Sequence, residues 1–203
     1  MSILSAILLS MAINIDTLKL SFSSKANNSI LLKFKILFIA IFTSIMTFVS
    51  MCLGKIIDIF LTQKLSNIFG AVLIGFVGIN YIVEHIRKEK NKMGYDTSHY
   101  VEYFIKHKNI IEIENSSDNS DLITNLINVS FALSLNNIWP CIAGGLTGIS
   151  LSLTLLLNFL ICISFFIIGT LIRKKSLIRY IRLNHYLITA GLLIFLSLIE
   201  GFI

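Results

Sequence analysis

The sequence predicts an all-α membrane protein with six transmembrane helices, arranged as two inverted three-helix repeats. Hydrophobic residues make up 55% of its 203 residues and charged residues only 14%. The apolar residues come in long blocks, and roughly 20 of them in a helix cross the hydrocarbon core of a bilayer. Little of the chain is left to form a soluble core, so a soluble globular class is excluded.

Six segments have the length and composition of membrane spans. They are Ile3–Phe22, Ile36–Leu53, Ile68–Val83, Leu122–Ile142, Leu151–Ile172 and Tyr186–Ile203. The third and the sixth are short unless their flanks are included. The first has no basic residues before it and no small-residue cleavage site after it, which argues against a cleavable signal peptide.

The basic residues indicate how the spans are oriented. Fourteen of them fall in the loops after the first, third and fifth spans, and two, Lys55 and Lys64, fall in the loops after the second and fourth. Cytoplasmic loops of membrane proteins carry the excess of Lys and Arg. Both termini are therefore expected outside. The net charge of +6 therefore reflects orientation in the membrane. The expected partner is the lipid bilayer and not nucleic acid.

The second half of the chain repeats features of the first. SMAINIDTLKLSF aligns with SFALSLNNIWPCI at an offset of 120 residues. Gly54 then corresponds to Gly169 and Gly70 to Gly191, in the same order along the chain. Three spans per half is an odd number, so the second half crosses the membrane in the opposite sense. Inverted repeats are typical of transporters, whose sites lie near the midplane between the halves.

The predicted organisation follows from this repeat. Residues 1–86 form the first three-helix repeat, residues 87–121 a cytoplasmic linker, and residues 122–203 the second repeat. The linker contains His99 and His107, but their spacing matches neither one helix face nor a known ligand pattern. A solvated loop is favoured there over a metal sensor.

Small and polar residues form one narrow stripe on the first span and another on the fourth. The stripes are Ser10, Asn14, Thr17 and Ser21, and Ser130, Ser134, Asn137 and Cys141. Such stripes let helices approach closely and form hydrogen bonds with each other. Packing and ligand binding remain alternatives here, and Asn14, Thr17, Ser134 and Asn137 are candidates for an ion pathway because they are bulkier and nearer the midplane.

Asp16 is the most informative residue of the first span. An ionised carboxylate at bilayer depth costs about 2.5–3.5 kcal/mol on insertion scales, so it marks a candidate functional site. Its equivalent at the offset of 120 is Asn136. Lys19 lies three residues further on, within reach of Asp16. Either Lys19 is an internal counter-charge that pairs with Asp16, or it extends towards the cytoplasmic face and leaves Asp16 free.

Oxygen atoms of carboxylates and amides are the ligands that hard cations prefer. Asp16 is accordingly the candidate metal ligand, with Asn136 and the polar residues of the stripes around it. A second carboxylate is missing, because Glu84 and Glu200 lie near span ends and are expected to face water. Asn158 is expected to form hydrogen bonds between helices. No His or Cys faces a carboxylate at catalytic spacing, which argues against an enzyme, and no cofactor is predicted.

SMAINID in the first span and SFALSLN in the fourth resemble the ALSLD-type signatures of MntP-type manganese efflux pumps. They are closer still to the related YtaF-type sporulation membrane proteins. The resemblance implies a multi-pass protein of the bacterial cell membrane that transports Mn²⁺ or another divalent cation. Asp16 matches the first Asp of the exporter pair, Asn136 stands at the second, and Asn14 replaces a Ser that Ser134 retains. The alternative is a transport-inactive relative that acts as a membrane scaffold or partner-binding subunit.

Overall fold

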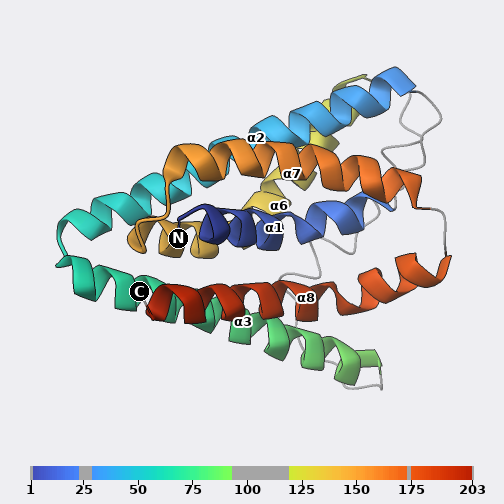
Figure 1. Cartoon of the computed structure of the whole chain (residues 1–203). Coiled ribbons are helices and arrows are strands. Elements are labelled where there is room, and N and C mark those ends of the chain that lie inside the picture. Colours follow the sequence, from blue (N-terminus) through green and yellow to red (C-terminus); the bar gives the residue numbers. More distant parts are fainter. Residues whose placement is uncertain (1, 23–28, 93–118, 173–174, 203) are drawn as a thin grey trace.

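A computed structural model describes residues 2–22, 29–92, 119–172 and 175–202, and all secondary structure within them is helical (Figure 1). The helices are α1 (Ser2–Ser21), α2 (Ser29–Ile59), α3 (Gln63–Lys92), α6 (Asn119–Leu146), α7 (Leu151–Leu171) and α8 (Lys175–Gly201). Both chain ends lie at the end of the bundle where α2 turns into α3 and α6 turns into α7 (Figure 1). The linker histidines lie outside the described residues.

All six helices are long and apolar enough to cross a membrane, which confirms the expected number of spans within the described residues. Their limits differ from the sequence expectation in the second, third, fourth and sixth spans. The second is Phe34–Ile59 and the fourth is Leu126–Leu146. The third runs over Gln63–Glu89, and the sixth begins at Leu183 instead of Tyr186. Hydropathy falls at the polar residues that flank these spans, but the helices continue through them.

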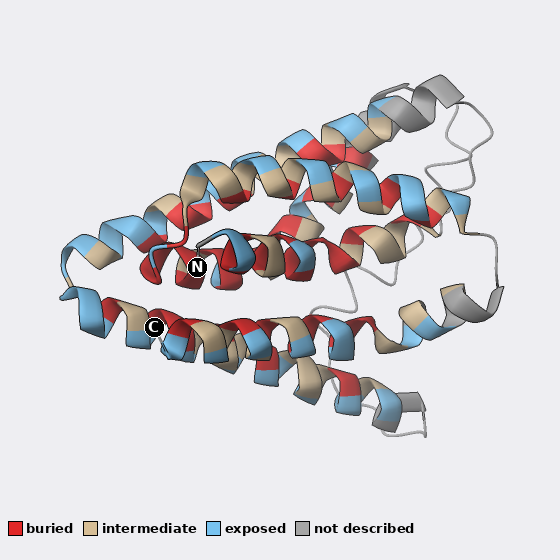
Figure 2. Cartoon of the chain, in the orientation of Figure 1, coloured by how far each residue is buried: buried red, intermediate tan, exposed pale blue. Residues whose placement is uncertain are grey.

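The distribution of side chains is the reverse of that in a soluble protein. Large apolar side chains cover the outer faces, among them Val72, Phe76 and Leu156, each about three-fifths exposed. Buried positions line the inward faces of the helices (Figure 2), and many of them carry Ser, Thr, Asn, Ala or Gly. Apolar surfaces this extensive are stable in contact with lipid and not with water. The architecture is that of a multi-pass membrane protein.

The helices of the two halves are interleaved. α3 packs along α8, α2 along α6, and α1 against α7 and α8, with further contacts of α3 and α1 to α6 and of α2 to α7. Every extensive helix pair thus joins one of α1, α2 and α3 to one of α6, α7 and α8. α1 is central, lying between α7 and α8 (Figure 1).

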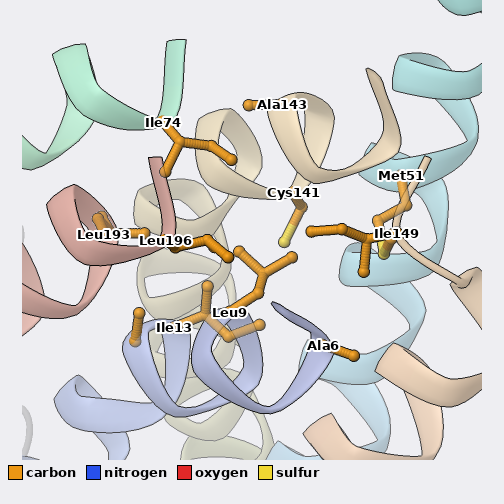
Figure 3. Packing of buried hydrophobic residues seen from close by; sticks show 11 residues of the cluster. Ala6, Leu9, Ile13, Met51, Ile74, Cys141, Ala143, Ile149, Leu193 and Leu196 are labelled. Atoms are coloured by element: carbon orange, nitrogen blue, oxygen red, sulfur yellow. The ribbon is translucent and has the colours of Figure 1, made fainter. Parts of the chain in front are cut away.

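The main apolar core surrounds the first half of α1. Leu9 of α1 is fully buried among residues from α2, α3, α6 and α8 (Figure 3). Its neighbours in this core include Met51, Ile74, Cys141, Leu193 and Leu196. A second, smaller core contains Ile39, Ala40, Cys162 and Phe166 and lies between α2 and α7. The second half of α1 carries Asn14 and Asp16, and its Leu20 packs against this second core.

Two glycines allow the closest helix crossings. A Cβ atom at Gly54 of α2 would lie 2.9 Å from Cα of Gly145 in α6, and closer still to the carbonyl oxygen of Ile142. A Cβ atom at Gly169 of α7 would lie 2.6 Å from Cβ of Ser21 in α1. Close backbone approach through small residues is the usual means of packing helices in lipid. Gly54 and Gly169 are also the glycines that the repeat places at equivalent positions.

Candidate functional site

The polar residues of α1 separate into two groups that face different neighbours. Asn14 and Thr17 are buried towards α2 and α7, as their contacts below show, whereas the half-buried Asp16 lies against Asn136 of α6. This agrees with the angular separation of about 100° between adjacent residues on a helix. The predicted pathway residues therefore do not line a single surface.

An uncharged hydrogen-bond network joins α1, α7 and α2. Asn14 Nδ2 donates to Asn158 Oδ1 at 2.6 Å and to the carbonyl oxygen of Ser10 at 2.8 Å. Asn158 Nδ2 in turn donates to Thr47 Oγ1 at 3.3 Å and to Ser44 Oγ at 3.4 Å. Asn158 thus forms hydrogen bonds between helices, as expected from the sequence. Thr17 and Thr43 lie on either side of the Cys162 thiol in the same region.

The equivalent polar stripe on α6 faces α1 at one point. Asn137 Nδ2 donates to the carbonyl oxygen of Ile13 at 3.0 Å. Ser134 Oγ donates within its own helix, to the carbonyl oxygen of Ser130 at 2.7 Å. The Ser130 hydroxyl is buried without a hydrogen-bond partner among the described residues. Asn137 therefore binds the two halves together, while Ser134 is already satisfied locally.

Asp16 and Asn136, the two residues placed at equivalent positions by the repeat, lie next to each other. Asn136 Nδ2 donates to Asp16 Oδ2 at 3.4 Å. Pro140 lies inside α6 and has no N–H group, so it cannot donate to the main-chain carbonyl of Asn136, four residues earlier. The helix thus leaves one main-chain oxygen without its usual donor at the residue that binds Asp16. Carboxylate, amide and main-chain oxygens are the kinds of ligand that a hard cation prefers, and these two residues carry all three.

Lys19 is directed towards α8. Its Nζ lies 3.1 Å from Nε2 of His185, a residue that is only 4% exposed. Its ammonium group also lies 5.7 Å from the centre of the Tyr186 ring. The Lys19 charge nonetheless acts on Asp16, together with that of Lys88. Lys19 therefore lies inside the bundle, where it contacts His185 and interacts electrostatically with Asp16.

Tyr186 lies between two ammonium groups. Lys88 of α3 donates to its hydroxyl group and lies 4.3 Å from its ring centre. The ring also lies 6.0 Å from the ring of Tyr81 and 3.9 Å from that of His185. An ammonium group over an aromatic face is attracted by the ring quadrupole, more so where water is excluded. Tyr186 thus holds α1, α3 and α8 together around the Asp16 region.

The charges of this region balance within the protein. Lys88 Nζ lies 3.9 Å from Oε1 of Glu84, one turn earlier in α3. Two carboxylates, Asp16 and Glu84, then face two ammonium groups, Lys19 and Lys88. Charged groups inside a membrane protein are stable when they pair with one another. We call the residues Asp16, Lys19, Glu84, Lys88, Asn136, His185 and Tyr186 the charged cluster.

The candidate metal ligand Asp16 supplies the carboxylate beside Asn136. Within the described parts of the chain, no three His, Cys, Asp or Glu side chains gather closely enough to hold a metal ion. Glu200 was expected to face water but is buried at 7% exposure, because α8 continues to Gly201 and packs there against Ala71 of α3. The Glu84 side chain is about a third exposed and pairs with Lys88. A cation at this site would be held by oxygen atoms of Asp16 and Asn136.

Lys88, His185 and Tyr186 belong to the site but were not singled out from the sequence. Lys88 lies near the end of α3, and His185 and Tyr186 lie where the apolar span of α8 begins, positions at which basic or amphipathic aromatic residues are common, so none looks unusual by itself. His185 lies at the start of the sixth span and is buried inside the bundle. The signal that could have found it is its spacing: His185, Thr189 and Leu193 share one face of α8 with other buried residues.

Comparison with known proteins gives no match: no family model, no curated protein and no solved structure is similar to this chain.

Proposed function

We propose that the chain is built from two inverted three-helix repeats in the bacterial cell membrane. The pattern of helix contacts supports this. The repeat makes α1 equivalent to α6, α2 to α7, and α3 to α8. When each helix is replaced by its equivalent, the α2–α6 pair becomes the α7–α1 pair. In the same way the α1–α8 pair becomes the α6–α3 pair, and all of these pairs are in contact. The pairs α3–α8, α2–α7 and α1–α6 map onto themselves. A pseudo-two-fold axis in the membrane plane would produce this pattern.

The location of both termini outside the cell is part of the same proposal. The helices α1, α3 and α7 end at the end of the bundle that lies opposite both termini (Figure 1). The loops that follow these three helices carry most of the basic residues. Positive charge is retained on the cytoplasmic side during insertion.

Within this architecture we propose a cation permease related to the YtaF-type sporulation proteins and manganese exporters, with Mn²⁺ or another divalent cation as cargo. The observation that carries the proposal is the contact between Asp16 and Asn136. These are equivalent positions of the two halves, and they meet at the interface about which alternating access would take place. The Asn136 main-chain oxygen released by Pro140 adds a neutral ligand at the same point.

The second candidate function is a transport-inactive membrane scaffold or partner-binding subunit. The charged cluster favours it, because Lys19 and Lys88 already supply the positive charge that Asp16 and Glu84 require. A divalent cation added to this neutral cluster would leave net positive charge in the membrane interior, which is costly. In this function the cluster serves stability alone.

One experiment separates the two functions. The chain is expressed in a bacterium that lacks its manganese exporter, and growth is measured over a series of MnCl2 concentrations. A permease protects the cells, Asp16→Asn abolishes the protection, and Asn136→Asp, which restores the second carboxylate, strengthens it. Asp58→Asn, at the end of α2, is the matched control and retains protection. Absence of protection by the wild type and by Asn136→Asp, at equal membrane expression, would leave the scaffold function.

A further inference from the structure

The contact between Lys19 and His185 constrains the protons of both side chains. Lys19 Nζ and His185 Nε2 are 3.1 Å apart, a hydrogen-bond distance. An ammonium group has only donors, so it can approach an imidazole nitrogen this closely only where that nitrogen carries a lone pair. With Lys19 charged, His185 is therefore neutral and carries its ring proton on Nδ1. A further proton on Nε2 would remove the acceptor and place two positive charges against each other.

Asp16 offers Lys19 a second acceptor on the same helix. Residues three positions apart on a helix are neighbours, and the Lys19 charge already acts on the Asp16 carboxylate. Lys19 thus has one partner, His185, that loses its acceptor on protonation, and another, Asp16, that attracts the ammonium group when its carboxylate is ionised. The flexible four-carbon side chain of lysine allows its ammonium group to move between them.

We propose that the site exchanges a proton for the transported cation, with His185 as the proton-binding group and Lys19 as a tethered cation that competes for Asp16. The proposal rests on the cation transport proposed above and adds its coupling ion. A proton from solution forms an N–H bond at His185 Nε2, and the hydrogen bond from Lys19 breaks. The Lys19 ammonium group then pairs with Asp16 and displaces the bound cation. Loss of the His185 proton reverses each step, so one proton is bound for each cation released.

Among the residues that the structure describes, the other charged and titratable members of the charged cluster are paired with one another. From α3, Lys88 is bound to the Tyr186 hydroxyl group and to Glu84, and Tyr81 stacks near Tyr186. From α1, only Lys19 and Asp16 carry charge. Lys19 is consequently the cation that responds when His185 changes its charge. His85 of α3 is buried and pairs with the exposed Glu89 at 3.7 Å; it does not belong to the charged cluster and so provides a comparison histidine.

The test uses the purified full chain in proteoliposomes, with MnCl2 added outside and either a metal-sensitive or a pH-sensitive dye inside. In the wild type, Mn²⁺ entry is accompanied by a rise in luminal pH as protons leave. In His185→Gln the amide oxygen still accepts a hydrogen bond from Lys19 but binds no proton. The number of protons moved for each Mn²⁺ ion that enters then falls at least fivefold. His85→Gln, the matched control, retains the wild-type ratio.

A second variant keeps the proposal open to refutation if His185→Gln does not fold. Lys19→Met removes the competing cation, so Mn²⁺ entry becomes independent of pH between about 6 and 8, whereas the exposed control Lys64→Met retains the wild-type pH dependence. Wild-type Mn²⁺ entry without a pH change, or unchanged coupling in both cluster variants, overturns the proton exchange and leaves the permease intact. Absence of Mn²⁺ entry in the wild type overturns the permease and the exchange together.

Discussion

Substitution of Gly54 by alanine tests the helix packing at its tightest point. Gly54 is buried where α2 crosses α6, and an added Cβ atom would lie 2.9 Å from Cα of Gly145, against an ordinary contact of at least 3.4 Å. It would also collide with the carbonyl oxygen of Ile142. These are backbone atoms, which cannot rotate away as a side chain can. The helices must therefore move apart along their crossing.

The expected loss of stability follows from two opposing effects. Overpacking of a close-packed interior costs about 1–3 kcal/mol, and rigid backbone neighbours place Gly54→Ala near the upper limit. Alanine regains about 1 kcal/mol of intrinsic helix propensity over glycine. The free energy of unfolding should therefore fall by about 2 kcal/mol. Gly191→Ala is the matched control, because a Cβ atom there meets nothing within 4 Å.

The assay is equilibrium unfolding in mixed micelles of increasing dodecyl sulfate content, followed by the fluorescence of Trp139, the one tryptophan of the chain. Gly54→Ala should unfold at lower dodecyl sulfate content than the wild type, and Gly191→Ala should not. Equal stability of Gly54→Ala and the wild type would refute the described crossing of α2 and α6. An equal loss in both variants would show that the effect does not arise from the crossing.

The same packing and hydrogen bonds support further predictions. Gly169→Ala should also lower the free energy of unfolding, because the added Cβ atom would lie 2.6 Å from Cβ of Ser21. The additional change Ser21→Gly should restore much of the lost stability, and absence of this rescue would contradict the contact. Asn158→Leu should lower the free energy of unfolding by about 1 kcal/mol, because it removes hydrogen bonds between helices. Asn80→Leu changes an exposed residue and should leave the free energy of unfolding unchanged in the same assay. An equal effect of both substitutions would contradict the hydrogen-bond network. Alkaline phosphatase fused at the C-terminus should be active outside the cell and inactive when inserted after α3, and the opposite pattern would reverse the proposed orientation.

The number of spans and the meeting of Asp16 with Asn136 could be anticipated from the sequence. The number of spans follows from the number of long apolar segments. A segment that crosses the bilayer must be helical along its whole length, because its backbone polar groups find no hydrogen-bond partners in lipid. The repeat suggested that Asp16 and Asn136 are equivalent, and residues on a pseudo-two-fold axis are neighbours of their own equivalents. Their hydrogen bond is the contact that such an axis would produce.

The rest of the charged cluster could not be anticipated in this way. Lys19, Lys88 and Tyr186 come from three helices, and helix periodicity defines a face without naming the neighbour that covers it. Two alternatives for Lys19 stayed open for that reason: pairing with Asp16 or extension to the surface. The contact with His185 is a third arrangement, which depends on the packing of α1 against α8.

Equilibrium binding of Mn²⁺ to the purified protein tests most directly whether Asp16 is the cation ligand between the two halves. The free Mn²⁺ signal in electron paramagnetic resonance is measured as MnCl2 is titrated into the wild type, Asp16→Asn and the control Asp58→Asn at pH 7.5. The role of Asp16 as the ligand predicts that the wild type and Asp58→Asn remove one equivalent of Mn²⁺ from the free pool and that Asp16→Asn removes none. Binding of the same stoichiometry and affinity by Asp16→Asn would contradict it.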